Sequence, residues 1–195
     1  MKNGKKVCIP FVKGERIYLR ELRISDVNRK YHQWMNDEEV TRFLESRFSP
    51  NSTEKLRTYV TDITKNKKYV FFAIVEKNSD RHIGNIKLGP INWIHRFGDI
   101  GIMLGDKSSH GKGYGTEAVE LVTRFAFETL NLRKVTASCY SNNIGSIRIF
   151  QKSGFFEEGR RKEQYFSEGS YVDLVQFGKI NPSKTGGGNG WPEKS

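Results

Sequence analysis

The sequence predicts one α/β domain built on a mixed, mostly antiparallel sheet with helices on its faces. Alternating apolar and polar residues mark strand pairs toward both ends of the chain, and a single strand-helix-strand crossover lies between them. The length of 195 residues suits one domain that buries its own core, and no internal repeat divides it. A doubly wound parallel sheet is therefore not expected.

The first third of the domain is expected to be mostly helical. A first strand over Arg16–Leu19 is followed by Ser25-Asp26, which can cap a helix. Apolar residues at helical spacing then predict helices over Val27–Met35, Glu38–Leu44 and Thr53–Ile63.

Beyond residue 68 the spacing of apolar residues alternates between strand-like and helical. Two further helices are expected, over Tyr114–Thr129 after a glycine-rich turn and over Ile144–Lys152, which Ser153-Gly154 ends. The remaining strands are predicted over Tyr69–Val75, His82–Leu88, Asp99–Leu104, Lys134–Tyr140 and Tyr171–Phe177.

Composition restricts the class of partner and the compartment. The formal charge of +11 favours an anionic partner but does not distinguish nucleic acid, nucleotide cofactor or acidic metabolite. Cys8 and Cys139 are the only cysteines and lack C-x-x-C spacing, so neither a disulfide framework nor a metal site is expected. No apolar run approaches the length of a membrane span, and no secretory signal is recognisable. We expect a cytoplasmic protein without a membrane partner.

Three regions are expected along the chain: a lead-in over 1–15, the folded domain over 16–179 and a flexible tail over 180–195. The tail is rich in Gly, Pro and Lys and cannot bury enough surface to order itself. Its Trp191 either docks on the domain or stays unanchored.

The stretch GDKSSHGKGYGT, residues 105–116, is the most informative turn of the sequence. It matches neither a Walker loop nor a dinucleotide-binding fingerprint, because the spacing of its glycines is wrong for both. Its glycines still allow successive backbone N–H groups to converge just before a helix, which is a site for an anion such as a diphosphate. The alternative is a strand-to-helix turn that binds nothing.

Two motifs together resemble the GNAT acetyltransferase superfamily. GIMLGDKSSHGKGYGTEAVELVTRFAF is similar to its acetyl-CoA motif, and NNIGSIRIFQKSGF is similar to a later segment at the separation that the family shows. The resemblance covers roughly Glu15 to Lys179 and is closest to the branch of ribosomal-protein alanine, spermidine and amino-sugar acetyltransferases. It implies a GNAT fold, with a sheet splayed between the fourth and fifth strands. His110 stands where the family usually has Gln or Arg.

The resemblance implies acetyl-CoA as cosubstrate and assigns residues to it. Backbone groups of Ile102, Met103 and Leu104 would pair with the pantetheine arm, and Asn143 and Ser146 would line the thioester end. The alternatives are a plain helix cap for Asn143 and a solvent-facing hydroxyl for Ser146. The diphosphate would be bound by the turn residues His110, Gly111, Lys112, Gly113, Tyr114, Gly115 and Thr116.

Acetyl transfer to an amine requires a group that accepts the amine's proton. Asp99 falls where some family members carry a general-base glutamate, although it could equally begin the strand without a catalytic role. His95 in the preceding loop is the second candidate base, and a surface histidine is the alternative. Many relatives have an acidic tyrosine where this chain has Phe150, so Tyr140, Ser146, water or no dedicated acid would protonate the leaving thiolate.

Tyr31, Trp34, Asn36 and Asp37 are the candidate residues for binding the acceptor. Aromatic faces stack on sugar rings, and a carboxylate pairs with a cationic amine. The alternative for Tyr31 and Trp34 is core packing of an amphipathic helix.

The leading hypothesis is an acetyl-CoA-dependent N-acetyltransferase acting on a nucleotide-linked amino sugar. A protein N-terminus or a polyamine is the alternative acceptor, and the net positive charge disfavours a polycation. Two other classes remain open: a nucleic-acid binding module using Lys65–Tyr69 or Arg160–Lys162, and a non-catalytic coenzyme A sensor. The expected partner is a small-molecule amine, no nucleic acid is expected, and a homodimer is left open.

Overall fold

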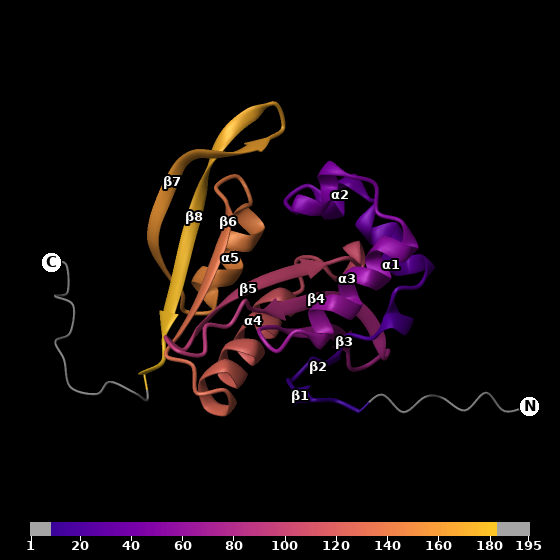
Figure 1. The fold of residues 1–195 in the computed structure, drawn as a ribbon, viewed down its shortest axis with the longest axis horizontal. Coiled ribbons are helices and arrows are strands. Elements are labelled where there is room, and N and C mark those ends of the chain that lie inside the picture. Colours follow the sequence, from indigo (N-terminus) through magenta and orange to yellow (C-terminus); the bar gives the residue numbers. More distant parts are fainter. Residues whose placement is uncertain (1–8, 183–195) are drawn as a thin grey trace, which may run out of the picture.

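A computed structural model describes residues 9–182 and shows one sheet with helices on both faces (Figure 1). The sheet has 8 strands in the order β1-β2-β3-β4-β5-β6-β8-β7, and β5 with β6 is its parallel pair. The predicted fold class, a mixed and mostly antiparallel sheet flanked by helices, is confirmed. The strands are β1 (Val12–Lys13), β2 (Ile17–Glu21), β3 (Val70–Glu76), β4 (Arg81–Leu88), β5 (Phe97–Leu104), β6 (Lys134–Tyr140), β7 (Phe156–Ser167) and β8 (Ser170–Ile180).

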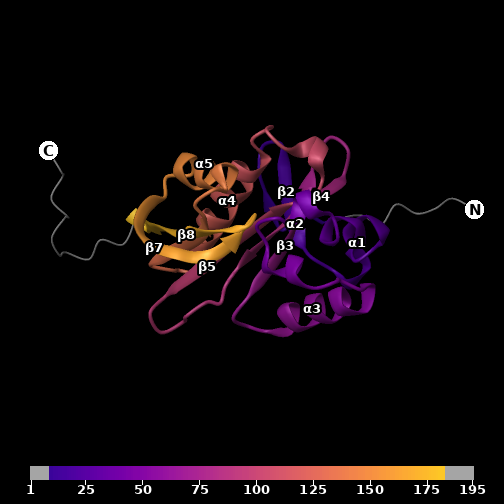
Figure 2. The same cartoon turned by 90° about the horizontal axis from the view of Figure 1, so that it is seen from above.

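The helices divide between the two faces of the sheet. Figure 2 shows α4 and α5 on one side of the sheet and α3 on the other. Short 3₁₀ turns, η1 to η3, connect elements, and α4 continues as the π-helical turn η4 (Phe125–Thr129). The α-helices are α1 (Arg29–Met35), α2 (Glu38–Thr41), α3 (Thr53–Lys65), α4 (Tyr114–Arg124) and α5 (Ile144–Lys152), and the 3₁₀ turns are η1 (Ile24–Asp26), η2 (Glu45–Phe48) and η3 (Lys107–Ser109).

Each face of the sheet has its own hydrophobic core. On one face, Ala118 and Val122 of α4 pack with Ile17 and Ile100, and all of these side chains are buried. On the other face, α1 and α3 bury residues that include Tyr31, Trp34, Leu56 and Val60. Burial of these apolar stripes attaches the short helices, which would be marginal in isolation, to the sheet.

The sheet opens between β5 and β6. These strands pair from Phe97 with Lys134 to Ile100 with Ala137, and then they separate. On its other side β5 stays paired with β4 as far as Leu104. Within residues 9–182, the β6-facing edge of Gly101–Leu104 therefore has no neighbouring strand, and this opening places a binding edge beside the glycine-rich turn.

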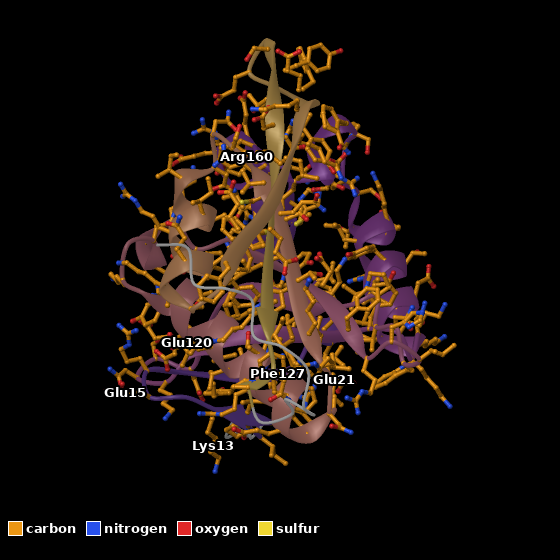
Figure 3. All side chains as sticks on the ribbon, turned by 90° about the vertical axis from the view of Figure 1, so that its left-hand side faces the viewer. Lys13, Glu15, Glu21, Glu120, Phe127 and Arg160 are labelled. Atoms are coloured by element: carbon orange, nitrogen blue, oxygen red, sulfur yellow. The ribbon has the colours of Figure 1, made fainter. Side chains whose placement is uncertain are left out.

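Two strands lie where the sequence analysis expected none. β7 is exposed and highly charged, and its register with β8 shifts at two places, which breaks the alternation that predicts strands. Arg160, labelled in Figure 3, lies on this long hairpin. The short β1 falls inside the expected lead-in.

The described chain stays packed slightly beyond the expected end of the domain at residue 179. Asn181 is 2% exposed, and its side chain donates to the carbonyls of Phe127 and Leu132. Trp191 and Cys8 lie outside the described residues. Within 9–182, no helix is long and apolar enough to cross a membrane.

Candidate active site

The glycine-rich turn presents a row of unused backbone donors at the start of α4. Gly111 and Gly113 have φ values of 72° and 80°, a conformation that L side chains rarely adopt. In the described part of the chain, no backbone N–H from Gly111 to Thr116 has a hydrogen-bond partner. A Cβ added at Gly111 would meet nothing within 4 Å, so the space beside Gly111 is open. This arrangement can hold an anion with several negative oxygens.

The charges around the turn differ from residue to residue. Lys112 is exposed, and its side chain forms no ion pair or hydrogen bond with residues 9–182, so its ammonium is available to an anion. The His110 ring instead turns back toward β5, with Nε2 2.9 Å from the carbonyl oxygen of Leu104. That carbonyl is one of the groups expected to bind pantetheine, and its oxygen can still accept a second hydrogen bond.

Asp99 lies at the point where β5 and β6 begin to separate. It sits opposite Thr136, whose hydroxyl donates to Asp99 Oδ1 at 2.9 Å. Burial raises the pKa of Asp99 to about 6, and the Thr136 hydrogen bond and the Lys87 ammonium oppose that rise. Oδ2 has no hydrogen-bond partner among the described residues. A carboxylate with a pKa near neutrality can accept a proton there.

His95 is exposed in the loop between β4 and β5. Its backbone N–H donates to Asn92 Oδ1 at 2.9 Å, which fixes the turn rather than the ring. The loop precedes β5, whereas the glycine-rich turn follows it. His95 thus lies at the opposite end of β5 from the open edge, and Asp99 is the better placed of the two candidate bases.

Asn143 and Ser146 start α5, directly after the separated end of β6. Asn143 Oδ1 accepts from the backbone N–H of Ser146 at 3.1 Å, so it caps the helix as the alternative interpretation expected. The half-buried Ser146 hydroxyl contacts Cys139, whose thiol pKa is raised to about 11 by burial despite this contact. Their roles at a thioester stay predictions.

Phe150 is 1% exposed and packs against the rings of Phe155 and Phe177. Tyr140, the candidate substitute acid, donates its hydroxyl to Glu45 Oε1 at 3.1 Å. Burial, together with this bond, raises the pKa of Tyr140. The proton source for a leaving thiolate, whether Tyr140, Ser146, water or no dedicated acid, stays a prediction.

The residues expected to bind the acceptor all have structural partners. Tyr31 and Trp34 are 2% and 6% exposed, so both rings contribute to the core beside α1. The Asn36 amide donates to the carbonyls of His32 and Asn51. Asp37 caps α2 and pairs with Lys107, whose hydrogen bond holds the pKa of Asp37 below its usual value. Their role in binding the acceptor stays a prediction.

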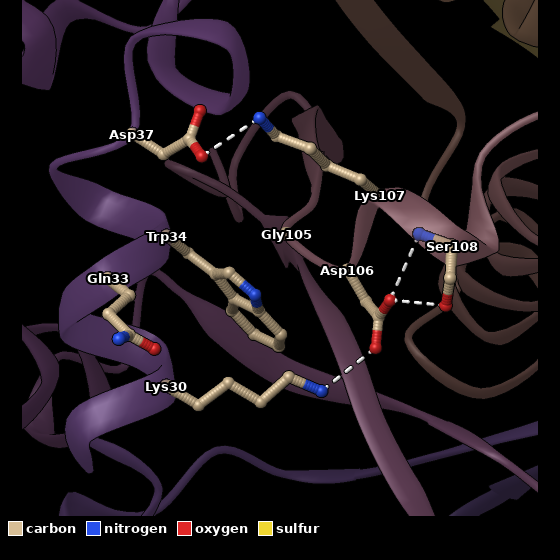
Figure 4. A pocket seen from close by; sticks show the side chains of 8 residues that line it. All are labelled: Lys30, Gln33, Trp34, Asp37, Gly105, Asp106, Lys107 and Ser108. Carbon is tan, nitrogen blue, oxygen red and sulfur yellow. Dashed lines mark hydrogen bonds and ion pairs between the residues drawn. The ribbon is translucent and has the colours of Figure 1, made fainter.

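A pocket of about 460 Å³ lies between α1 and the turn after β5 (Figure 4). Its lining charges are paired: Lys30 lies 2.8 Å from Asp106, and Lys107 lies 2.9 Å from Asp37. Trp34 covers Gly105 so closely that a Cβ there would lie 2.1 Å from the indole. The ion pairs among the lining residues thus connect α1 and the start of α2 with the glycine-rich turn, and these charges already have partners. Within 9–182, no cluster of potential metal ligands occurs.

The α2-η2 segment reaches across to the β7-β8 hairpin, a contact that sequence reasoning missed. Arg47 Nη2 donates to the carbonyl of Phe166 at 2.7 Å, and its guanidinium lies 5.1 Å from the Tyr140 ring. Arg42 forms an ion pair with Glu168 at the hairpin tip. Arg42 and Glu168, and likewise Arg47 and Phe166, are more than a hundred residues apart, so no local pattern could have revealed these contacts.

Comparison with known proteins agrees with this geometry. Residues 16–156 match the family model described as "Acetyltransferase (GNAT) domain". A Bacillus subtilis protein named "Probable N-acetyltransferase YjcK" is 31% identical over 178 residues, which cover 88% of this chain and 97% of that protein.

Two solved structures share the fold. Spermidine N-acetyltransferase from Vibrio cholerae, in complex with CoA and spermine, has a TM-score of 0.77 at 23% identity and covers 86% of this chain and 97% of its own. Ribosomal-protein-S5-alanine acetyltransferase from Vibrio fischeri has a TM-score of 0.73 at 24% identity and covers 89% and 97%. The family match, the relative and the shared fold agree, and the chain is an acetyltransferase of the GNAT family.

Proposed function

We propose that this acetyltransferase takes its acetyl group from acetyl-CoA and transfers it to the primary amine of a small molecule. The observation that carries the proposal is the row of unpaired N–H groups from Gly111 to Thr116, next to the open edge of β5. A diphosphate on the turn would leave the rest of an extended coenzyme free to follow that edge toward Asp99.

The residues present fit the coenzyme. The turn offers N–H donors, the positive end of the α4 dipole and the Lys112 ammonium to the diphosphate. Gly101–Leu104 offers a strand edge without a neighbour on the β6 side among the described residues. When bound, acetyl-CoA supplies the acetyl group as a thioester.

Asp99 would remove the proton that the acceptor's ammonium must lose before it can attack. A free alkyl ammonium has a pKa of about 10.4, so few amines are neutral at pH 7. The unpartnered Oδ2 of Asp99 would receive this proton, directly or through one water molecule, while Thr136 holds Oδ1. The leaving thiolate would take its proton from water.

Two acceptor classes follow from different observations. A nucleotide-linked amino sugar comes first, because a chain with a formal charge of +11 favours an acceptor that carries a diphosphate. A polyamine comes second, because the structurally similar Vibrio cholerae enzyme was solved with spermine and because Glu45 and Asp99 supply carboxylates. A protein N-terminus is the third acceptor to test.

A nucleic-acid binding function has weaker support. In the basic run of β7, Arg160 is paired with Glu157 at 2.6 Å and Lys162 with Asp173 at 3.0 Å. These cations are partly neutralised by their neighbours, so the run is better explained as a solvated strand than as a phosphate-binding surface.

The test is a thiol-release assay with acetyl-CoA and a panel of nucleotide amino sugars, free amino sugars, spermidine and alanine-first peptides. We expect amine-dependent release of free thiol and a product heavier by one acetyl group in mass spectra. Calorimetry with coenzyme A accompanies the assay. Binding without transfer to any amine would favour the sensor hypothesis, and absence of binding would overturn the coenzyme assignment.

A further inference from the structure

Glu117, in the first turn of α4, binds the start of β2 through an unusually complete set of hydrogen bonds. Its Oε1 accepts from the backbone N–H groups of Glu15 at 2.7 Å, Arg16 at 2.9 Å and Ile17 at 3.3 Å. Its Oε2 accepts from Arg16 Nε at 3.0 Å. Burial alone would raise the pKa of Glu117, but these hydrogen bonds hold it below its usual value. The carboxylate is therefore a fixed charge.

The chain before β2 is shaped around this carboxylate. A Cβ on Gly14 would lie 2.5 Å from Glu117 Oε1, so only glycine permits so close an approach. In Figure 3, Glu15, which precedes β2, and Glu120, which lies on α4, are at the same edge of the molecule. A glutamate that only interacted with the positive end of the helix dipole would need none of these hydrogen bonds. The bonds join residues about a hundred positions apart.

Arg16 then connects this contact to the glycine-rich turn. Its Nη1 donates to the carbonyl of Lys112 at 2.8 Å, and its Nη2 donates to the carbonyl of Gly113 at 3.4 Å. The guanidinium also lies over the Tyr114 ring, 5.5 Å from its centroid. One planar fork thus holds two successive peptide groups of the turn.

The direction of these bonds matters for the donors on the other side. In a trans peptide the C=O and N–H groups point in opposite directions. With the carbonyls of Lys112 and Gly113 turned toward Arg16, the N–H groups of Gly113 and Tyr114 point away from its guanidinium. A Cβ on Gly113 would lie 3.1 Å from Arg16 Nη2, so the fork and the glycine fit each other.

We propose that Arg16 and Glu117 are a positioning pair, in which Glu117 fixes Arg16 and Arg16 turns the N–H groups of Gly113 and Tyr114 toward the diphosphate of the coenzyme. The inference rests on the proposed coenzyme binding at this turn. Neither residue touches the reacting atoms. The pair determines the affinity for the diphosphate and does not affect the rate of acetyl transfer.

Arg16→Lys is the decisive variant, because it keeps the positive charge but loses the planar fork. If the N–H groups of Gly113 and Tyr114 no longer point at the diphosphate, their charge-assisted hydrogen bonds to it are lost. We therefore expect the Kd for coenzyme A, measured by calorimetry on the full chain, to rise about 10- to 100-fold. Glu117→Gln is the second variant. Its amide cannot accept from both Arg16 Nε and the three backbone N–H groups, and the same direction of change is expected.

S-acetylpantetheine, which lacks the diphosphate, separates positioning from general damage. For Arg16→Lys, the KM for acetyl-CoA should rise with its Kd, whereas kcat and the KM for S-acetylpantetheine should stay at the wild-type values. Arg124→Lys is the matched control, because Arg124 also bonds α4 to the N-terminal strands, through the carbonyl of Lys13, but does not contact the turn. Its Kd for coenzyme A should not change.

Three results decide the matter. A wild-type chain that does not bind coenzyme A overturns the proposed function itself. Wild-type binding with an unchanged Kd in a folded Arg16→Lys variant overturns only the positioning role and reduces the pair to a stability feature. An equal rise in KM for acetyl-CoA and S-acetylpantetheine also overturns it, since a diphosphate-specific device would spare the shorter substrate.

Discussion

Thr136 and Asp99 face each other across β5 and β6, one pair before the last at which these strands remain joined, and the threonine hydroxyl donates to Asp99 Oδ1 at 2.9 Å. The bond fixes Oδ1, while Oδ2 has no hydrogen-bond partner among the described residues. It also partly offsets the burial that raises the pKa of Asp99 to about 6. The hydrogen bond thus holds one oxygen of the candidate base and moderates the rise in pKa that burial causes.

Asp99→Asn should lower kcat by about two to four orders of magnitude, because asparagine keeps the shape but cannot accept the proton. The Kd for acetyl-CoA should not change, and part of the loss should be recovered at high pH, where the amine is already neutral. Steady-state kinetics between pH 6 and 10 check this. A variant with the wild-type rate and pH profile would remove Asp99 from the mechanism and make His95 the first candidate.

The same substitution should make the protein more stable at neutral pH. The folded pKa of Asp99 lies above its usual value, so the folded chain binds the proton more tightly and stability falls as pH rises from about 4 to 6. At pH 7 the ionised group costs no more than about 3 kcal/mol. Removing the charge should therefore raise Tm in thermal unfolding at pH 7 and much less at pH 4, and a lower Tm at pH 7 would contradict this reasoning.

Thr136→Val tests the hydrogen bond without removing the base. Loss of a donor to the carboxylate destabilises its ionised form, so the pKa of Asp99 should rise above about 6. The acidic limb of the profile of kcat/KM against pH should move to higher pH by roughly one unit, with full activity restored above it. Thr123→Val serves as the control, because that threonine on α4 is also buried but its hydroxyl makes no hydrogen bond within the described residues.

Gly111→Asp should raise the Kd for acetyl-CoA at least about tenfold. The new carboxylate would project into the open side of the turn, where a Cβ meets no atom, and would repel the diphosphate. Gly111→Asn has the same size, tolerates positive φ as aspartate does and lacks the charge, so its effect should be much smaller. Equal affinities for both variants in calorimetry would argue against an anion at this turn.

Phe150→Tyr should give no increase in rate. The ring is 1% exposed and packed against Phe177, so a new hydroxyl would be buried without a partner and would cost about 1 to 3 kcal/mol of stability. Chemical denaturation and kcat measured together check both parts. A marked gain in kcat would mean that the hydroxyl reaches the leaving thiolate and that its protonation limits the reaction.

The sequence alone determined whatever depends on residues close together in the chain. The glycine-rich turn, α4 and the Asn143 cap of α5 each follow from spacing within a few residues, because helix periodicity, capping and positive φ are local properties. The two motifs also led to the family, which the match over residues 16–156 confirms. The roles of Asp99, His95 and the acceptor residues stay predictions at this level.

Only the tertiary structure decided which side chains are committed to packing and which distant groups meet. The spacing of Tyr31 and Trp34 is the same whether their rings contact a ligand or pack in a core, and only the structure shows that both rings are buried in the core. The irregular pairing of β7, the contact of Arg47 with Phe166 and the bonds of Glu117 to Arg16 join elements that approach each other only once the sheet has formed. These contacts become favourable only after the intervening chain has closed into loops and water has left the space between the elements. The residues next to any one position in the sequence do not reveal either condition.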